Sequence, residues 1–186
     1  NGATYAAGLS GQAFSFDGVD DFMVAPATGL PIGNSDRTMT LWVMADSFTS
    51  SNLVDTPEEF FCGYGRFGVF TQSYVLGSGA TYVFVTNWGK GISGGVLETD
   101  RWYHVAAVTR GNITSLYVNG LFKKGVTLDI NTPADTQFLG GRIPGELGDV
   151  RKLDGAIDEI AVYNRALSAD EIRSLFSNPS PSASKP

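Results

Sequence analysis

The chain has 186 residues, the length of one large all-β domain, which leaves little room for a second folded unit. The frequent glycines (23) and few charged residues (17%) are typical of many short strands joined by tight turns. A net charge of -6 argues against a nucleic-acid partner, because phosphate binding needs clustered lysine and arginine. The single cysteine, Cys62, excludes an internal disulfide, and no apolar run is long enough to insert into a membrane.

Strand patterns begin early in the chain. Residues 13–25 alternate between apolar and polar types around the turn Asp17-Gly18, as expected of two strands joined at a polar corner. In residues 38–44 the alternation places Leu41 and Trp42 on opposite faces of another strand. Runs rich in β-branched and aromatic residues predict further strands over residues 67–70, 81–86, 102–110, 114–118 and 157–163.

Two local motifs predict a hairpin turn and a helix start. Asn119-Gly120 follows a strand pattern and predicts a two-residue turn, because both central positions of a type I′ turn need positive φ. Ser168 with Glu171 three residues later is a capping-box pattern and predicts a short C-terminal helix. Many strands and one helix favour two stacked antiparallel sheets over residues 1–176. Residues 177–186 are rich in Pro and Ser and predict a linker or tail.

Several segments, in order along the chain, resemble the laminin-G-like group of the concanavalin A-like lectin and glucanase superfamily. They are Phe-Asp-Gly-Val-Asp-Asp-Phe at 16–22, Thr-Leu-Trp-Val at 40–43, Trp-Tyr-His-Val-Ala at 102–106, Leu-Tyr-Val-Asn-Gly at 116–120, and Gly-Ala-Ile-Asp-Glu-Ile through Ala-Leu-Ser at 155–168. The resemblance covers about residues 8–176. It implies a jelly-roll sandwich with one concave and one convex sheet, found in secreted and cell-surface proteins as an adhesion or carbohydrate-binding domain. It does not name a ligand, and residues 50–95 match no family pattern.

No catalytic residues are expected. Glucan-cleaving members of this superfamily carry carboxylates spaced along one strand, where residues i and i+2 share a face. Asp158 and Glu159 are adjacent, so we expect them on opposite faces. His104 is the only histidine and is expected to be a structural strand residue, since one histidine cannot supply a multi-ligand catalytic metal site. A hydrolase or lyase with a divergent site is the less favoured alternative.

An acidic turn makes calcium the expected metal. Asp17 and Asp20 offer hard oxygen ligands, which calcium accepts together with backbone carbonyls and water. The resemblance implies that Asp158 joins this early turn in holding a structural calcium, which gives a metal site of Asp158, Asp17, Gly18 and Asp20. The alternative is a plain turn whose aspartates are solvated or cap local amides.

Trp88 is the leading candidate for sugar contact. It is flanked by glycine and polar residues outside the family pattern, which indicates an exposed ring on which a pyranose stacks. Asn87 and Lys90 would read the sugar hydroxyls, whereas the alternative is that Trp88 is a packed loop anchor. The same region supplies four more ligand-binding candidates: Tyr64, Arg66, Tyr74 and Tyr82. Asn112 begins an N-glycosylation motif whose use depends on the host.

The sequence therefore predicts a non-catalytic, calcium-stabilised carbohydrate-binding domain. It is expected outside the cell or on its surface, within a larger protein, with a glycan or polysaccharide as partner. A structural or adhesion domain that contacts protein or assembles with itself is the alternative.

Overall fold

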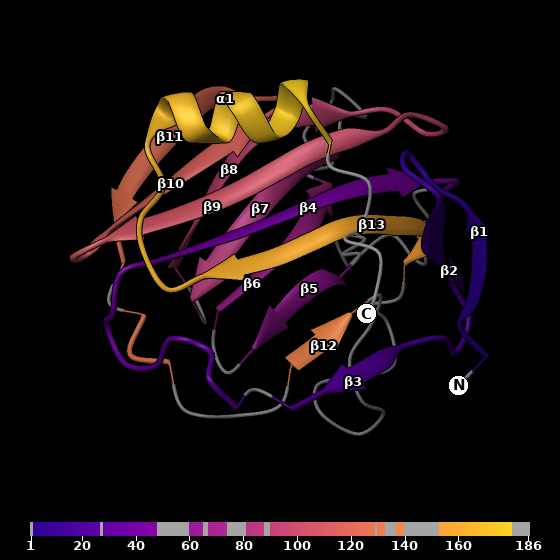
Figure 1. Cartoon of the computed structure of the whole chain (residues 1–186), viewed down its shortest axis with the longest axis horizontal. Helices are drawn as coiled ribbons and strands as arrows, with labels where there is room; N and C mark the ends of the chain where they lie inside the picture. The colour runs from indigo at the N-terminus through magenta and orange to yellow at the C-terminus, as the bar shows by residue number, and fades with distance from the viewer. Residues whose placement is uncertain are drawn as a thin grey trace.

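The computed structural model describes residues 2–26, 28–47, 60–64, 67–73, 81–87, 90–128, 130–132, 137–139 and 153–179. Within these residues the chain forms thirteen strands and one helix (Figure 1). The strands are β1 (Thr4–Ala7), β2 (Gln12–Asp17), β3 (Met23–Ala25), β4 (Arg37–Ala45), β5 (Phe60–Tyr64), β6 (Phe67–Ser73), β7 (Thr81–Asn87), β8 (Lys90–Leu97), β9 (Tyr103–Arg110), β10 (Ile113–Val118), β11 (Leu121–Thr127), β12 (Gln137–Leu139) and β13 (Asp154–Tyr163). The helix α1 spans Ala169–Ser177. Residues 180–186 of the predicted tail lie outside the described ranges.

The strands form two antiparallel sheets. The 7-stranded sheet has the order β1-β2-β13-β4-β9-β10-β11, and the 6-stranded sheet has the order β3-β12-β5-β6-β7-β8. The last strand, β13, lies between β2 and β4 and joins the two ends of the described chain in one sheet. This arrangement confirms the predicted all-β sandwich with a short C-terminal helix.

The core follows from the two-residue period of the strands. In β4, Leu41 is fully buried between the sheets, as are Val105 of β9 and Leu116 of β10. Each such side chain stabilises the fold by about 1.5–3 kcal/mol through removal of apolar surface from water. Trp42 points to the opposite face of β4, as the alternation predicts. Although it lies on the outer face of the sheet, Trp42 is only 7% exposed, because α1 covers it.

The helix α1 packs against the outer face of the 7-stranded sheet (Figure 1). Ile172 lies on Ala106 of β9, and Phe176 stacks on Trp42 with ring centroids 5.6 Å apart. The predicted capping box is present, because the Ser168 hydroxyl accepts the Glu171 amide and the Glu171 carboxylate accepts the Ser168 amide. Among the described residues, no helix is long and apolar enough to cross a membrane.

The predicted hairpin turn joins β10 and β11. Asn119 and Gly120 have φ values of 51° and 73°, as a type I′ turn requires. A Cβ on Gly120 would lie 3.2 Å from Phe176, so the turn also supports α1. The Asn119 carboxamide accepts a hydrogen bond from the His104 amide at 2.9 Å.

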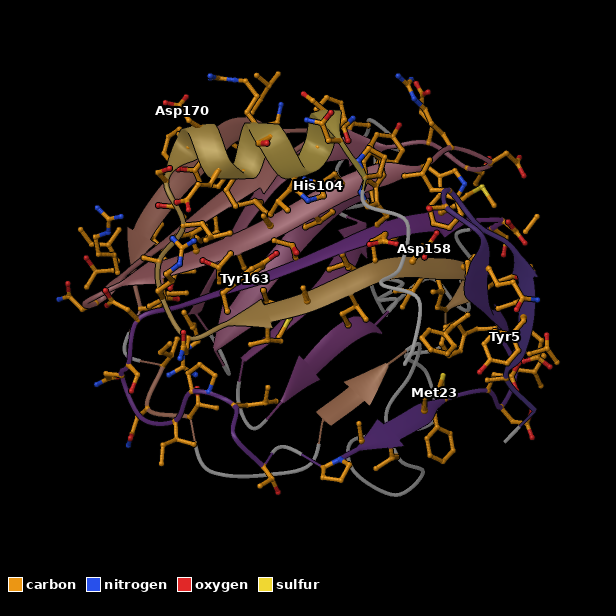
Figure 2. The ribbon with its side chains drawn as sticks, in the orientation of Figure 1. Tyr5, Met23, His104, Asp158, Tyr163 and Asp170 are labelled. Carbon is orange, nitrogen blue, oxygen red and sulfur yellow. The ribbon has the colours of Figure 1, made fainter. Side chains whose placement is uncertain are left out.

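His104 lies under α1 (Figure 2). Its ring packs beside the stacked rings of Trp42 and Phe176, with centroids 5.4 Å and 6.3 Å away. Its side chain is 2% exposed, and its Nδ1 has no hydrogen-bond partner in the part of the chain that the structure describes. Burial lowers the pKa of His104 to about 4. The imidazole is therefore a neutral packing group at physiological pH.

A buried arginine ties two loops to the sheet. Arg37, at the start of β4, is fully buried and donates to the carbonyls of Ser35 (3.0 Å) and Gly33 (2.8 Å). It also donates to the hydroxyl of Thr132 at 2.9 Å. The guanidinium fork thus holds the segment before β4 against the segment after β11.

We expect Arg37→Leu to destabilise the domain by about 3 kcal/mol, because it leaves the buried Thr132 hydroxyl and the part-buried carbonyls of Gly33 and Ser35 without their donor. Urea unfolding of the variant and the parent measures the difference. Arg101→Leu is the control, since Arg101 pairs only with exposed Glu98 among the described carboxylates and should cost less than about 1 kcal/mol. Equal losses for the two variants would contradict the anchoring role.

We expect His104 to make the domain acid-sensitive. The unfolded chain binds a proton below pH 6.5, whereas the folded chain does so only near pH 4. The free energy of unfolding should therefore fall by about 3 kcal/mol as pH drops from 6.5 to 4. Urea unfolding at a series of pH values measures this loss. In His104→Phe, which keeps a ring in the same place, this part of the pH dependence should vanish; an unchanged profile would contradict it.

Candidate functional site

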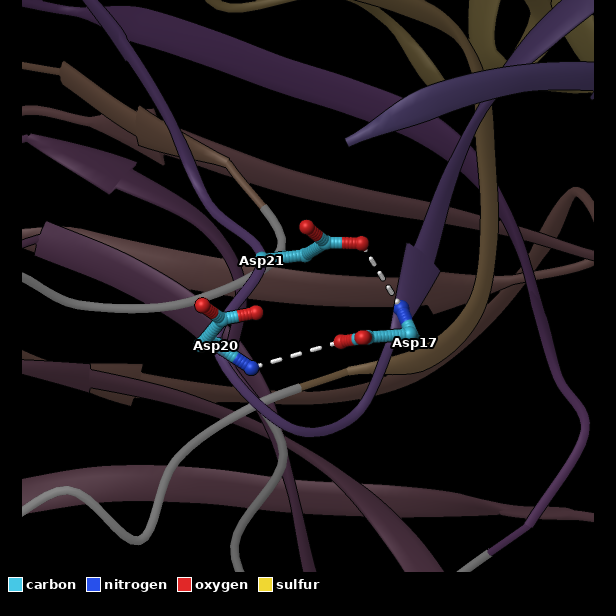
Figure 3. Close-up of side chains that lie close together, drawn as sticks. All are labelled: Asp17, Asp20 and Asp21. Carbon is cyan, nitrogen blue, oxygen red and sulfur yellow. Dashed lines mark hydrogen bonds between the residues drawn. The ribbon is translucent and has the colours of Figure 1, made fainter. Parts of the chain in front are cut away.

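The predicted acidic turn brings three carboxylates together at the end of β2 (Figure 3). Ligand oxygens of Asp17, Asp20 and Asp21 lie within 4.8 Å of one another. Asp17 and Asp20 are exposed, whereas Asp21 is only 4% exposed. The sequence pattern therefore located a group of oxygen donors of the kind that calcium accepts.

The same carboxylates also hold the backbone of the turn. Asp17 Oδ1 accepts the amides of Val19 (2.8 Å) and Asp20 (3.3 Å), and the Val19 amide is the main cause that lowers the pKa of Asp17. Asp21 accepts the amides of Gly2 (2.6 Å) and Asp17 (3.0 Å). These bonds match the alternative in which the aspartates cap local amides.

Gly18 is required by the strand that passes beside it. Its φ is 72°, and a Cβ would lie 2.7 Å from the Cβ of Asp154. Asp154 is the register partner of Asp17 and accepts the Ser47 hydroxyl at 2.5 Å. The sequence reading missed Asp154, because nothing local pairs it with Asp17.

Further acidic groups lie where β4 and β13 meet at this end of the sheet. The Asp46 amide donates to the Asp154 carbonyl at 2.8 Å. Burial raises the pKa of Asp46, and the negative charges of Asp154 and Asp100 add to the effect. This rim of the sheet is therefore acidic beyond the predicted turn.

Asp158 lies away from the acidic turn of Asp17 and Asp20. It follows Asp154 by four residues on β13, about 13 Å along the strand from the residue that faces Asp17. Asp158, labelled in Figure 2, is 6% exposed. Its carboxylate accepts the amides of Ser10 (3.1 Å) and Glu159 (2.9 Å). The structure thus brings Asp17, Gly18 and Asp20 together but leaves Asp158 out of that group.

Glu159 has a backbone conformation that the sequence pattern did not predict. A bulge in β13 between Asp158 and Ala161 gives Glu159 a φ of 47°. The bulge breaks the alternation, since Ile157 and then Ile160 both pack toward the core. The expectation that Asp158 and Glu159 point to opposite faces, which assumed a regular strand, therefore does not hold at this bulge.

The neighbourhood of Asp158 fits a cation. Oε1 of Glu159 is a buried atom with no hydrogen-bond partner among the described residues. Burial raises the pKa of Glu159, and the charge of Asp158 raises it further. A Cβ on Gly8 would lie 2.5 Å from Asp158 Oδ2, so the β1–β2 turn comes close only because residue 8 is glycine. Two carboxylates, one with an oxygen that has no partner in the described part of the chain, are ligands of the kind that calcium binds.

The predicted sugar-binding residues that the structure describes lie in the 6-stranded sheet. Tyr64 and Asn87 both pair with Phe67, and Asn87 pairs with Lys90. The register thus aligns three candidates in one row at the ends of β5, β7 and β8. Tyr82 lies five residues before Asn87 on β7, about 17 Å away along the strand. Three candidates lie outside the described residues: Arg66, Tyr74 and Trp88.

Solved structures share this fold. Domain 4 of AbnA, an extracellular GH43 arabinanase from Geobacillus stearothermophilus in complex with arabinotriose, is 23% identical, with a TM-score of 0.70 over 94% of this chain and 81% of that domain. The heptameric SAP-like pentraxin from Limulus polyphemus is 19% identical, with a TM-score of 0.64 over 87% of this chain and 80% of the pentraxin. Trypanosoma rangeli sialidase is 19% identical, with a TM-score of 0.67 over 90% of this chain but only 27% of the sialidase.

At these identities the likeness shows the fold alone. No curated protein sequence matches the chain. A family model, Laminin_G_3, described as the concanavalin A-like lectin/glucanases superfamily, matches residues 17–173. Because the match covers most of the chain, the protein belongs to this superfamily, as its sequence motifs indicated.

Proposed function

We propose that the chain is a non-catalytic carbohydrate-binding domain of a secreted or cell-surface protein. The observation that carries the proposal is the likeness, along 94% of the chain, to a domain of an extracellular arabinanase whose structure holds arabinotriose. A sugar ligand also agrees with the match to a superfamily of lectins and glucanases. The domain would hold a partner domain near a polysaccharide rather than cleave it.

The proposed sugar site lies at the end of the 6-stranded sheet marked by the row of Tyr64, Asn87 and Lys90. Asn87 and Lys90 flank Trp88 in the sequence and would read hydroxyl groups while the indole stacks on a sugar face. Arg66, Tyr74 and Tyr82 are the remaining candidates for this contact.

The surroundings of the acid–base groups support a non-catalytic role. His104 is buried under α1, where no substrate reaches it. The carboxylates of Asp17 and Asp21 are engaged by backbone amides of their own turn. A glycosidase instead needs two carboxyl groups that flank one bond across an open cleft.

We expect the isolated domain to be retarded in affinity gels that contain soluble polysaccharides, with arabinan as the first probe. Trp88→Ala should weaken retention by about tenfold or more, a loss of about 1.4 kcal/mol. Tyr5→Ala is the matched control, because Tyr5 is a 65% exposed aromatic on β1 in the other sheet and should leave retention unchanged.

Three outcomes would contradict this proposal. Release of reducing ends from the same polysaccharides would show that the chain cleaves glycosidic bonds. If no glycan on an array binds the domain and the domain associates with itself as its concentration rises, the structural or adhesion role is favoured. Equal losses in Trp88→Ala and Tyr5→Ala would place the sugar elsewhere.

Calcium is the second part of the proposal. We place the ion beside Asp158 and Glu159 for two reasons. A cation would give Glu159 Oε1 the partner that it lacks among the described residues, and it would offset the repulsion between the two carboxylates. There it would link β13 to the turn between β1 and β2. The Asp17–Asp20 turn is the competing position, since its oxygens retain lone pairs beyond the amide bonds.

We expect calcium, compared with EDTA, to raise the melting temperature by roughly 5–10 °C when free calcium is about 100 times Kd, because the ion binds only the folded state. Differential scanning calorimetry measures the shift in each variant. Asp158→Asn should abolish the shift, whereas Asp20→Asn should retain it. The reverse result would move the ion to the early turn, and no shift in the parent would exclude the site.

A further inference from the structure

The outer face of the 7-stranded sheet is only partly covered by α1 (Figure 1). Ala106 and Val108 of β9 lie under the helix, but the neighbouring hairpin of β10 and β11 carries large apolar groups in the open. Phe122 is 57% exposed and Ile113 is 51% exposed. The register places both side chains on the face that α1 covers. Phe122 pairs with Tyr117, which pairs with Ala106 under the helix. Ile113 lies two residues from Ser115, the partner of Val108, and therefore points to the same face.

A glycine lies between these two side chains. A Cβ on Gly125 would be 3.7 Å from Ile113 Cγ2, 3.8 Å from Phe122 Cε2 and 3.3 Å from Ser115 Oγ. Without that Cβ, the backbone of the edge strand β11 is open between an aromatic ring and an aliphatic side chain. Glycine within a strand often marks a bulge or a site where a ligand or another backbone approaches closely. The bulge of this strand pair lies at Leu116 and Tyr117 rather than at the partner of Gly125.

The Phe122 ring is held in place from behind. Tyr117 meets it edge to face, with ring centroids 5.6 Å apart and an interplanar angle of 71°. Tyr117 in turn packs on the cluster beneath α1. A supported, exposed ring is preorganised for stacking and loses little side-chain entropy when a ligand binds.

The surface carries one exposed basic side chain that the register places on this face, Arg110. Lys124 pairs with core-facing Leu116 and therefore lies on the other side of β11. Arg110 pairs with Ile113, so the two side chains share a face, and Arg110 forms no ion pair with any residue that the structure describes. The nearby carboxylate of Asp36 accepts the Gly111 amide at 2.7 Å.

We propose that this surface of β9–β11, defined by Arg110, Ile113, Phe122 and Gly125, binds an acidic sugar chain. Phe122 stacks on one sugar ring over Gly125, and Arg110 holds a carboxylate or sulfate group of another ring. The Cα atoms of Phe122 and Arg110 lie roughly 17 Å apart by strand register, four residues along and two strands across. That span suits an oligosaccharide rather than a single sugar.

Polar groups beside the apolar pair favour a sugar over a protein partner. The hydroxyls of Ser115 and Thr127 and the amide of Asn112 border the apolar pair, which is the mixed surface that sugar hydroxyls require. Pairing with a second copy through the edge strand is opposed by the exposed Lys123 and Lys124 of β11, because charged side chains on an edge hinder strand addition.

This inference extends the proposed function to a second site and to a ligand class. The surface lies on the 7-stranded sheet, whereas the row of Tyr64, Asn87 and Lys90 lies on the 6-stranded sheet. Trp88→Ala should therefore leave acidic-sugar binding intact, so failure of one site does not imply failure of the other.

The test uses isothermal titration calorimetry with two matched pairs of probes, at about 0.15 M salt to limit non-specific attraction. Polygalacturonate is compared with its methyl ester, and dextran sulfate with dextran. We expect binding to at least one charged member and at least tenfold weaker binding to its neutral partner. The pair that responds tells whether a carboxylate or a sulfate is recognised.

Three variants locate the site. Phe122→Ala should weaken binding about tenfold, and Arg110→Gln should remove most of the preference for the charged probe. Gly125→Ala should weaken binding without loss of stability. The backbone φ of Gly125 is not positive, so alanine fits there without strain. The added Cβ makes ordinary contacts, apart from a close one to the flexible Ser115 hydroxyl. Melting temperatures verify that each variant is folded.

Matched controls lie close by. Leu121→Ala removes a side chain as exposed as Phe122 (57%) from the other side of β11, where Leu121 pairs with core-facing Val118. Arg101→Gln removes a positive charge outside the surface. Both should bind like the parent.

The proposal is overturned if neither charged probe binds, or if charged probes bind equally well to the parent and to folded Phe122→Ala and Gly125→Ala. It is also overturned if Phe122→Ala instead abolishes concentration-dependent self-association, which would assign the surface to a second copy of the chain.

Discussion

The insertion of β13 between β2 and β4 is the constraint on which the rest of the structure depends. One strand satisfies the backbone hydrogen bonds of two others and fixes the register of the sheet centre. Gly155, with a φ of 151°, lets β13 approach the Met44 carbonyl so closely that any side chain there would collide with it. The same strand carries Asp154 to the acidic turn and Asp158 to the β1–β2 turn, so both candidate metal positions are built on it.

The described polar groups fall into two kinds. Most buried ones are satisfied by backbone groups, as with Arg37 against loop carbonyls and Asp21 against two amides. Such bonds explain loop shape and need no ligand, since an unsatisfied buried group would be costly. Glu159 is different, because it combines positive φ, a neighbouring carboxylate and a buried oxygen that no described group hydrogen-bonds. Strain and unsatisfied polarity at one residue favour a functional role there over a purely structural one.

Local patterns in the sequence predicted the hairpin turn, the helix and most of the strands, but gave no range for β1, β5, β8 or β12. Register-dependent features were predicted poorly. The turn at Asn119-Gly120 and the capping box at Ser168 depend on residues next to each other, so their chemistry is readable in the sequence. The separation of Asp158 from Asp17 depends on which residues face each other across β2 and β13, which no local pattern encodes. The bulge at Glu159 likewise breaks the two-residue period on which strand prediction relies.

The topology also orders the events of folding. β9, β10 and β11 are consecutive and joined by short turns, so little chain entropy opposes their pairing. β13 must find β2 and β4 across most of the chain. Until it arrives, two long strand edges lie open to strands of other molecules, the condition under which partly folded β-proteins aggregate. We therefore expect the solubility of a nascent chain to be decided by its last strand.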